Sequence, residues 1–443
     1  MKNRMTFSTI TFLLLFSFAC KNDATPAITP VTSDEPNILL IIADDMGWDA
    51  FGKYPGTNGQ KAKTPVLDSL TKAGITFNNL WVNPTCSPTR AAIFTGKYGF
   101  RTGVGTALGG NTGGLSSSET LLQKYINDKT GNQYATAVIG KWHMSNNTQL
   151  SAPEQFGVGY YSGIFTGTIP SYTNWTKTSS GQQTNVTTYS TTYFVDDSKK
   201  WVSQQSKPWF LSMTLNAPHT PFHRPPLNLI SDQSLADNAA TISSTPLPYY
   251  LAAMEAMDAE LGRFFKGFTE TQKKNILIIF IGDNGTGVQV AQAPYSASTS
   301  KESLWQGGIN TPMIVSGFGV NRKNEVDNSL VNGTDLFATI ADVAGSGISQ
   351  VNDGYSLKAL IDNSTTFSRK YAYSEQFGST DTSVDGWTLR DSKYKLIHLT
   401  SGMEYFYDLS ADPFEKTNLI STTLSVEASA SLSAIRAEQT KLK

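Results

Sequence analysis

Short runs of consecutive apolar residues recur along the first three quarters of the chain. Unbroken apolarity is typical of strands buried on both faces, because a strand with one solvated face alternates apolar and polar positions. Longer segments with helical spacing lie between these runs. The predicted strands are residues 38–42, 136–139, 210–215, 276–281 and 312–315, and the predicted helices are residues 64–73, 118–129, 249–269 and 334–344. This order predicts an α/β fold with a large, mostly parallel sheet sandwiched by helices.

The pattern changes near residue 350, where short alternating segments separated by turn residues replace the long apolar runs. Such segments are typical of an antiparallel sheet. The predicted strands are residues 371–375, 387–390, 394–398 and 404–409, followed by a helix over residues 423–443. We therefore predict a catalytic domain over residues 37–350 and a smaller C-terminal α+β subdomain over residues 351–443.

Residues 157–193 are dominated by Ser, Thr, Gly, Asn and Tyr without a clear period. Loops of this length are uncommon in compact domains unless they serve a function. We predict a long surface excursion that borders a pocket.

The first twenty residues predict export. Basic residues precede the apolar stretch 12–16, which is too short to span a bilayer, and a small residue stands before Cys20. This pattern resembles a bacterial lipoprotein signal peptide over residues 1–20, with lipidation of Cys20 and a flexible tether over residues 21–36. Plain secretion with cleavage near Ala19 is the alternative. Either reading predicts an exported bacterial protein, and lipidation predicts an anchor in a membrane at the periplasm or cell surface.

Charge and cysteine content narrow the function classes. The 443 residues carry 35 Lys plus Arg and 36 Asp plus Glu, so no basic excess is available for a nucleic-acid backbone. Only two cysteines occur, Cys20 and Cys86. If Cys20 is acylated, Cys86 has no disulfide partner in an oxidising compartment, and a chemical role is one explanation for it.

Polar side chains follow four of the predicted strands directly. Ligands of open α/β sheets bind beyond the carboxyl ends of the strands, so these side chains are expected to meet in one crevice. Asp44, Asp45, Asp283 and Asn284 offer the hard oxygen ligands that Ca²⁺ or Mg²⁺ prefers, although adjacent aspartates alone also suit a solvated turn. Basic groups follow the other two strands: Lys141 and His143 after residues 136–139, and His219 after residues 210–215.

The sequence around the lone thiol is specific. Cys86, Pro88 and Arg90 form a C-x-P-x-R motif that leads into an apolar helix ending in Thr-Gly. This motif resembles the signature of type I, formylglycine-dependent sulfatases, the arylsulfatase family of the alkaline phosphatase-like superfamily. Further motifs occur in that family's order, at residues 44–47, 134–143, 217–221, 282–285, 301–308 and 407–413.

The resemblance implies a mechanism and a role for each site residue. Cys86 would be converted to formylglycine by a formylglycine-generating or maturase enzyme, and the hydrated aldehyde would attack sulfur. The implied calcium ligands are Asp44, Asp45, Asp283, Asn284 and the modified Cys86. The implied catalytic residues are Lys141 and Lys301, which bind sulfate, Arg90, which holds the hydrate, His143, which removes a proton from its second hydroxyl, and His219, which protonates the leaving group.

The chain departs from the resemblance at one place. Many relatives carry a glutamate just before the Gly-Gly pair and an arginine two residues after it, where this chain has Gln306 and Asn310. His223 and His398 receive no role from the motifs.

The expected substrate is a sulfated polysaccharide or oligosaccharide, because such polymers are trimmed outside the cytoplasm. Tyr160, Tyr161, Tyr172, Trp175 and Trp387 are suited either to stacking on sugar rings or to ordinary packing. Two alternatives remain open at the level of sequence. One is a phosphonate or phosphate ester hydrolase of the same superfamily, and the other is a surface glycan-binding lipoprotein without turnover.

Overall fold

The computed structural model describes residues 35–52, 54–364 and 369–443. The predicted signal peptide, Cys20 and nearly all of the predicted tether lie outside the described residues. In the part of the chain that is described, no helix is both long enough and apolar enough to cross a membrane.

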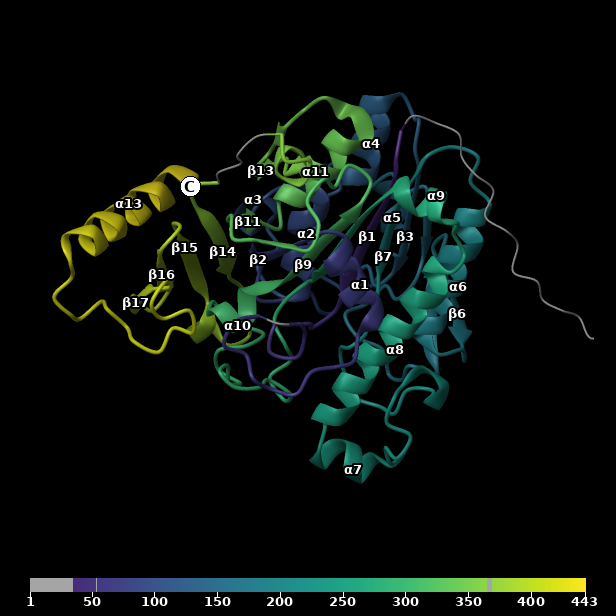
Figure 1. Cartoon of the computed structure of the whole chain (residues 1–443), viewed down its shortest axis with the longest axis horizontal. Helices are drawn as coiled ribbons and strands as arrows, with labels where there is room; N and C mark the ends of the chain where they lie inside the picture. Colours follow the sequence, from purple (N-terminus) through teal and green to yellow (C-terminus); the bar gives the residue numbers. More distant parts are fainter. Residues whose placement is uncertain (1–34, 53, 365–368) are drawn as a thin grey trace, which may run out of the picture.

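A nine-stranded sheet forms the centre of the described structure, with strand order β10-β2-β9-β8-β1-β7-β3-β4 and β11 paired to β2 (Figure 1). Its strands are β1 Asn37–Ala43, β2 Ile75–Trp81, β3 Ala135–Gly140, β4 Tyr160–Ser162, β7 Trp209–Thr214, β8 Ile276–Gly282, β9 Asn310–Gly317, β10 Glu325–Asp327 and β11 Val331–Asn332. The strands β8, β1, β7, β3 and β4 run parallel, whereas β9 is antiparallel to both of its neighbours. The predicted sandwich with a mostly parallel sheet is confirmed.

Strand β2 has no counterpart among the predicted strands. It alternates buried and half-buried positions and contains Asn78 and Asn79, so it lacks the unbroken apolar run of the central strands. Its position near the edge of the sheet, beside the short β10, explains this composition, because side chains there are partly solvated.

Helices cover both faces of the sheet. Alternate residues of β1 contact different helical layers: Leu40 belongs to a core shared with α2, α4 and α11, and Leu39 to a core shared with α1, α6 and α8. These helices are α1 Pro65–Ala73, α2 Cys86–Thr95, α4 Leu122–Thr130, α6 Ser190–Ser203, α8 Leu247–Phe265 and α11 Asp335–Ala341. The shorter elements are α3 Gly99–Thr102, α5 Ala152–Gln155, α7 Ala239–Ser244, α9 Glu270–Lys274, α10 Gln306–Ile309, α12 Lys358–Ile361, β12 Gln350–Val351 and β13 Gly354–Tyr355.

The segment 157–193 is more ordered than the predicted excursion. It contributes the edge strand β4 to the main sheet, forms a hairpin from β5 Trp175–Ser179 and β6 Gln182–Val186, and then enters α6. Half of the residues in the two hairpin strands are exposed, and β6 has no buried position, so these strands lack the hydrophobic pattern that would predict them.

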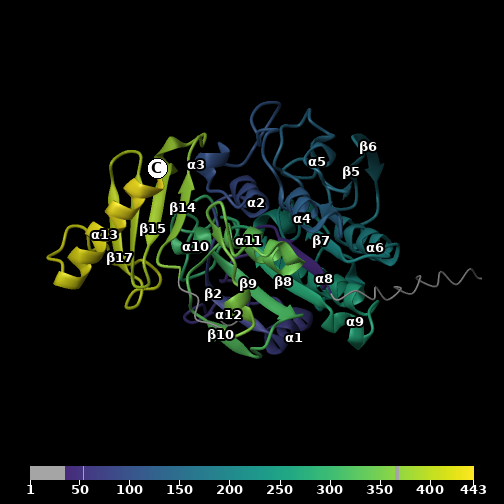
Figure 2. The same cartoon turned by 90° about the horizontal axis from the view of Figure 1, so that it is seen from above.

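The C-terminal part forms a second sheet beside the main body, covered on one face by the last helix (Figure 2). Its strands pair antiparallel in the order β14-β15-β16-β17, and their cluster of buried side chains includes Leu396 and Phe406 with Leu432 and Ile435 of the helix. The elements are β14 Ala372–Gln376, β15 Gly386–Arg390, β16 Tyr394–Leu399, β17 Glu404–Asp408 and α13 Val426–Leu442.

Candidate active site

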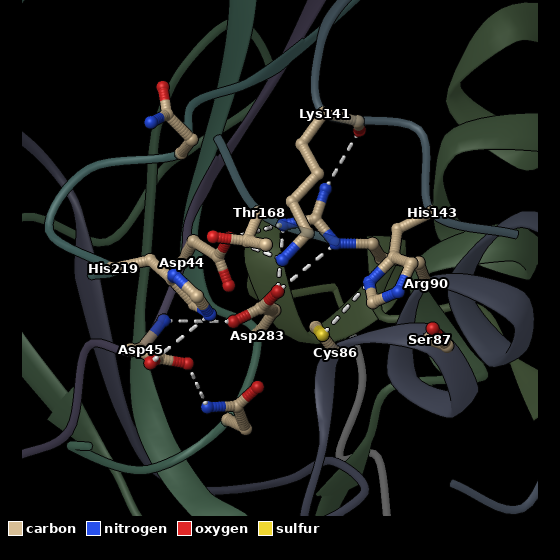
Figure 3. A network of polar contacts seen from close by, with 12 residues as sticks. Asp44, Asp45, Cys86, Ser87, Arg90, Lys141, His143, Thr168, His219 and Asp283 are labelled. Carbon is tan, nitrogen blue, oxygen red and sulfur yellow. Dashed lines mark hydrogen bonds and ion pairs between the residues drawn. The ribbon is translucent and has the colours of Figure 1, made fainter. Parts of the chain in front are cut away.

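Four neighbouring parallel strands bring the site residues together. Because β8, β1, β7 and β3 are adjacent and parallel, their carboxyl ends lie at one edge of the sheet. The residues that follow these ends form one polar network, and the first residue of α2 reaches it from a separate segment (Figure 3). The network includes Asp44 and Asp45 after β1, Asp283 after β8, His219 after β7, and Lys141 and His143 after β3.

Cys86 lies at the first position of α2, directly after Thr85, whose extended backbone precedes the helix. The Cys86 Sγ is 3.1 Å from His143 Nδ1, and the His143 Nε2 is 2.8 Å from the Leu108 carbonyl oxygen. A carbonyl oxygen only accepts, so Nε2 carries the proton and Nδ1 directs its lone pair toward residue 86. Burial, assisted by Lys141, holds the pKa of His143 well below its usual value, which keeps this imidazole neutral.

Three buried carboxylates each face a cation of the chain. Lys141 Nζ is 2.6 Å from Asp44 Oδ2, Lys301 Nζ is 2.7 Å from Asp45 Oδ1, and Arg90 Nη2 is 2.7 Å from Asp283 Oδ2. Burial by itself would raise the pKa of Asp44, but Lys141 and the other nearby cations hold it below its usual value. Burial and the neighbouring Asp44 raise the pKa of Asp283 to about 7.

The donor set fits a divalent cation. Asp44 Oδ1 and Asn284 Oδ1 are buried and have no hydrogen-bond partner among the described residues, which is costly for oxygens removed from water. One ligand atom each of Asp44, Asp45 and His219 lies within 4.8 Å of the other two. The carboxylate oxygens of Asp44 and Asp45 and the amide oxygen of Asn284 are hard ligands of the kind that Ca²⁺ or Mg²⁺ prefers. Asp45 also adopts a left-handed backbone with φ 66°, a conformation that costs a non-glycine residue about 1 kcal/mol and is frequent at functional sites.

The structure distributes the predicted ligands unequally. The orphaned oxygens belong to Asp44 and Asn284, and Asn284 Nδ2 donates to Asp45 Oδ1 at 2.8 Å. Asp283 already accepts hydrogen bonds from the Asp45 backbone and from Arg90. His219, which the motifs indicated only as an acid, stands beside Asp45 in the compact cluster.

His219 is held in the tautomer opposite to that of His143. Its Nδ1 donates to the Thr220 carbonyl oxygen at 2.8 Å, so Nε2, which is 3.8 Å from Asp45 Oδ2, is the nitrogen that can exchange a proton. The Tyr172 hydroxyl donates to the His219 carbonyl oxygen at 2.6 Å and secures the loop.

A wall of the site comes from residues that the motifs did not indicate. Thr168 and Ile169 line the space between Lys141 and His219. Gly167 packs against the His143 ring, where an added Cβ would come within 2.4 Å of the imidazole. All three lie in the segment 157–193, so the unusual length and the Gly and Thr content of this segment were the available signal.

The segment that carries Lys301 is braced by the C-terminal subdomain. Lys395 Nζ donates to the Leu304 carbonyl oxygen at 2.7 Å, and Glu415 accepts from the Gln306 backbone at 2.6 Å. The Lys395–Glu415 ion pair itself spans 2.5 Å and is buried. With Gln306 and Asn310 at the two positions where the chain departs from the resemblance, Lys301 still reaches Asp45.

The two unassigned histidines lie outside the network. His223 stacks on Tyr172 with ring centroids 3.9 Å apart, and His398 stacks on Trp387 and pairs with Glu404. Of the aromatic residues considered for sugar stacking, Tyr161, Tyr172 and Trp175 are fully buried and belong to the packing of the protein.

Fold and site together define a hydrolase of anionic esters, with basic groups, imidazoles and a metal-type carboxylate cluster around one helix N-terminus. The family description Sulfatase matches residues 36–346, and the description N-sulphoglucosamine sulphohydrolase, C-terminal, matches residues 299–441. The chain belongs to the sulfatase family and is a sulfuric ester hydrolase. This family uses a metal ion and formylglycine.

Curated relatives agree with this assignment, and solved structures share the fold. The chain is 26% identical to arylsulfatase G of Rattus norvegicus over 83% of this chain and 76% of that protein. It is 25% identical to an ulvan-active sulfatase of Formosa agariphila, over 93% of this chain and 81% of that protein. Ps i-CgsB, solved in complex with k-i-k-neocarrahexaose, shares the fold with a TM-score of 0.76, 24% identity and 92% of both chains covered. A structure in complex with D-glucosamine-2-N,6-O-disulfate gives a TM-score of 0.74 at 19% identity, over 92% of this chain and 98% of that one.

Proposed function

We propose that this sulfatase removes sulfate from sulfated polysaccharides or oligosaccharides, and that Cys86 is its modified residue. The observation that carries the proposal is the position of Cys86. It begins α2, and its Sγ is 3.1 Å from Nδ1 of the neutral His143, beside Lys141 and the carboxylate cluster. Formylglycine at this position supplies a hydrated aldehyde, an oxygen nucleophile that a thiol does not offer.

Positive groups of the chain are arranged to bind the sulfate. Lys141 and Lys301 contact Asp44 and Asp45 in the structure, and both reach the space next to Cys86. The N-terminus of α2 adds the partial positive charge of its free backbone N–H groups. Arg90 is fully buried and donates to Asp283 and to the Lys141 carbonyl oxygen. It therefore positions Asp283 and Lys141, which both lie close to residue 86.

His143 and His219 transfer protons at opposite sides of the bound sulfate group. His143 presents Nδ1 to residue 86 and accepts a proton there. His219 presents Nε2 on the other side of the carboxylates, beside Asp45, and in its imidazolium form, with a proton on both ring nitrogens, it gives the Nε2 proton to the departing alcohol oxygen. The opposed tautomers keep these roles separate.

The carboxylate cluster is proposed to hold one Ca²⁺ through Asp44, Asp45, Asp283 and Asn284, with residue 86 as a further ligand. A bound cation would neutralise charge on the sulfate oxygens. The two orphaned buried oxygens support this assignment over a purely ionic cluster.

A sulfated carbohydrate is supported by the curated and solved relatives. One is named ulvan-active, and others were solved with a neocarrahexaose or a disulfated glucosamine.

We further propose that the protein is exported and anchored through Cys20. Cys86 is 2% exposed, so the maturation enzyme must act on it before the chain folds.

The test combines mass and rate measurements on protein produced with a maturation enzyme. In the tryptic peptide of residues 73–90, we expect the sulfur of Cys86 to be replaced by an aldehyde oxygen. Turnover of an aryl sulfate should exceed that of the matched aryl phosphate, and Cys86→Ala should abolish it. An unmodified thiol in a fully active preparation would contradict the nucleophile, and faster phosphate hydrolysis would favour a phosphate ester hydrolase.

A further inference from the structure

A separate cavity of about 470 Å³ lies beside His219 and outside the network described above. Its walls come from the loop after β7, the helix α7 and the loop after β8; in Figure 1, α7 projects at the lower edge of the molecule. Cavities that bind small molecules span about 300–1,000 Å³, so this one is large enough for a ring-sized group. The lining residues used below are Thr220, Phe222, Asp237, Ala239, Ile242 and Gln289.

The cavity adjoins the leaving-group side of the site. Thr220 lines both this cavity and the space between Lys141 and His219, and its carbonyl oxygen accepts from His219 Nδ1. His219 Nε2 is the nitrogen assigned above to the departing oxygen. The sulfated ring carries that oxygen and lies at Thr220, and the cavity on the far side of Thr220 is where a residue linked to this ring would extend.

The chemistry of the walls suits an uncharged sugar ring. Phe222 and Ile242 are half-buried and offer an apolar surface, and the Phe222 ring is oriented by a perpendicular contact with Tyr250, at 90° and 6.3 Å. Gln289 is exposed and offers an amide for hydroxyl groups. Sugar rings combine an apolar C–H face with a polar edge, which matches a wall of this kind.

The charges at the cavity disfavour an anionic ring. No lysine or arginine is among the described residues that line it, whereas Asp237 is. The Asp237 carboxylate already pairs with Arg224 at 2.8 Å, so this arginine is engaged. A second sulfate or a uronic acid would find no free cation here, in contrast to the lysines at the cleavage site.

We propose that this cavity binds the uncharged sugar residue next to the sulfated one, so that the enzyme recognises sulfated oligosaccharides rather than isolated sulfated monosaccharides. The inference rests on the proposed function, because it uses the assignment of His219 to the leaving group.

Two adjacent alanines of α7 give a matched test. Ala239 and Ala240 are both exposed, but of the two only Ala239 lines the cavity. Ala239→Trp fills the cavity, and Ala240→Trp adds the same side chain outside it. The probes are an aryl sulfate and two sets of sulfated disaccharides, whose neighbouring ring is either a neutral hexose or a uronic acid, assayed for kcat/KM.

We expect Ala239→Trp to lower kcat/KM about tenfold or more on the neutral-neighbour disaccharides, and Ala240→Trp to stay within twofold of the wild type. Thermal unfolding of both variants at the wild-type Tm shows that the substitutions leave the fold intact. Equal rates for the two variants on every disaccharide, a wild-type preference for the uronic acid neighbour, or turnover of the aryl sulfate alone would overturn the inference. A wild type that hydrolyses no sulfate ester would instead contradict the proposed function.

Discussion

Backbone carbonyl groups set the tautomers of both site histidines. The Leu108 carbonyl oxygen accepts a hydrogen bond from His143 Nε2, and the Thr220 carbonyl oxygen accepts one from His219 Nδ1. The free nitrogens are therefore different atoms on the two rings, and they face different parts of the site. Backbone acceptors of this kind leave each ring one defined nitrogen for proton exchange.

Substitution of His219 should separate substrates by their leaving group. We expect His219→Ala to lower kcat/KM on alkyl or sugar sulfates by about 100-fold or more, and on aryl sulfates with acidic phenols by less than about tenfold, because a good leaving group needs little protonation. His143→Ala is the control and should reduce both classes alike. Equal losses for His219→Ala on both substrates would remove it from the leaving-group role.

Protonation of His223 should oppose folding. Burial lowers the pKa of His223 to about 4, and the neutral ring donates from Nδ1 to the Pro221 carbonyl oxygen while its Nε2 lies 3.1 Å from the Tyr189 hydroxyl. The unfolded chain binds this proton more tightly, so the contribution to stability is complete above about pH 6.5 and is lost as the pH falls toward 4. Its size is on the order of 3 kcal/mol.

Denaturant unfolding at pH 7 and at pH 4.5 measures this effect. The free energy of unfolding of His223→Gln should fall less over this interval than that of the wild type, because the variant has no imidazole to protonate. Parallel pH dependence in the two proteins would show that His223 is not linked to folding.

At the scale of elements, the two sheets are joined at the segment that carries Lys301. Lys395 on β16 and Glu415 after β17 bind the backbone on either side of Trp305, and they form a buried ion pair with each other. The C-terminal sheet therefore supports a loop of the catalytic domain.

Breaking this pair on one side should destabilise the protein. We expect Lys395→Met to lower the free energy of unfolding by about 3–5 kcal/mol, because Glu415 is left buried without its cation. The double variant Lys395→Met with Glu415→Gln should recover part of that loss, since no charge remains uncompensated. A double variant less stable than the single one would show that the unpaired charge of Glu415 is not the main cause of the lost free energy of unfolding.

The whole molecule gathers three carboxylates from two strands at one edge of its central sheet. Asp44 and Asp45 follow β1 and Asp283 follows β8, and all three are buried. Like charges at this range repel unless cations compensate them. The chain supplies Lys141, Lys301 and Arg90 for this purpose, and a bound divalent ion would add to them.

Removal of divalent cations should lower both activity and thermal stability. An ion present at a hundred times its Kd contributes about 2.7 kcal/mol, which corresponds to a few degrees in Tm for a chain of this size. Thermal unfolding with chelator, followed by addition of Ca²⁺, measures the shift. Asp44→Ala should lose the Ca²⁺-dependent shift, and Asp327→Ala, a buried ion-paired aspartate on β10, should retain it. An unchanged Tm after exhaustive chelation would contradict the metal site.

Local patterns determined much of this protein. The apolar runs predicted the central parallel strands, the alternating segments predicted β14 to β17, and the polar residues after each strand predicted the groups that meet at the site. These features are legible because burial on two faces, burial on one face and the end of a strand each leave a signal within a few residues.

Other features were decided only by tertiary structure. The antiparallel direction of β9, the strand β2, the carbonyl groups that set two tautomers, the wall at Gly167 and Thr168, and the brace from Lys395 and Glu415 have no local signature. Each depends on contacts between segments that are distant along the chain. A backbone carbonyl has the same chemistry in every residue, so only the folded arrangement determines which one meets a given histidine.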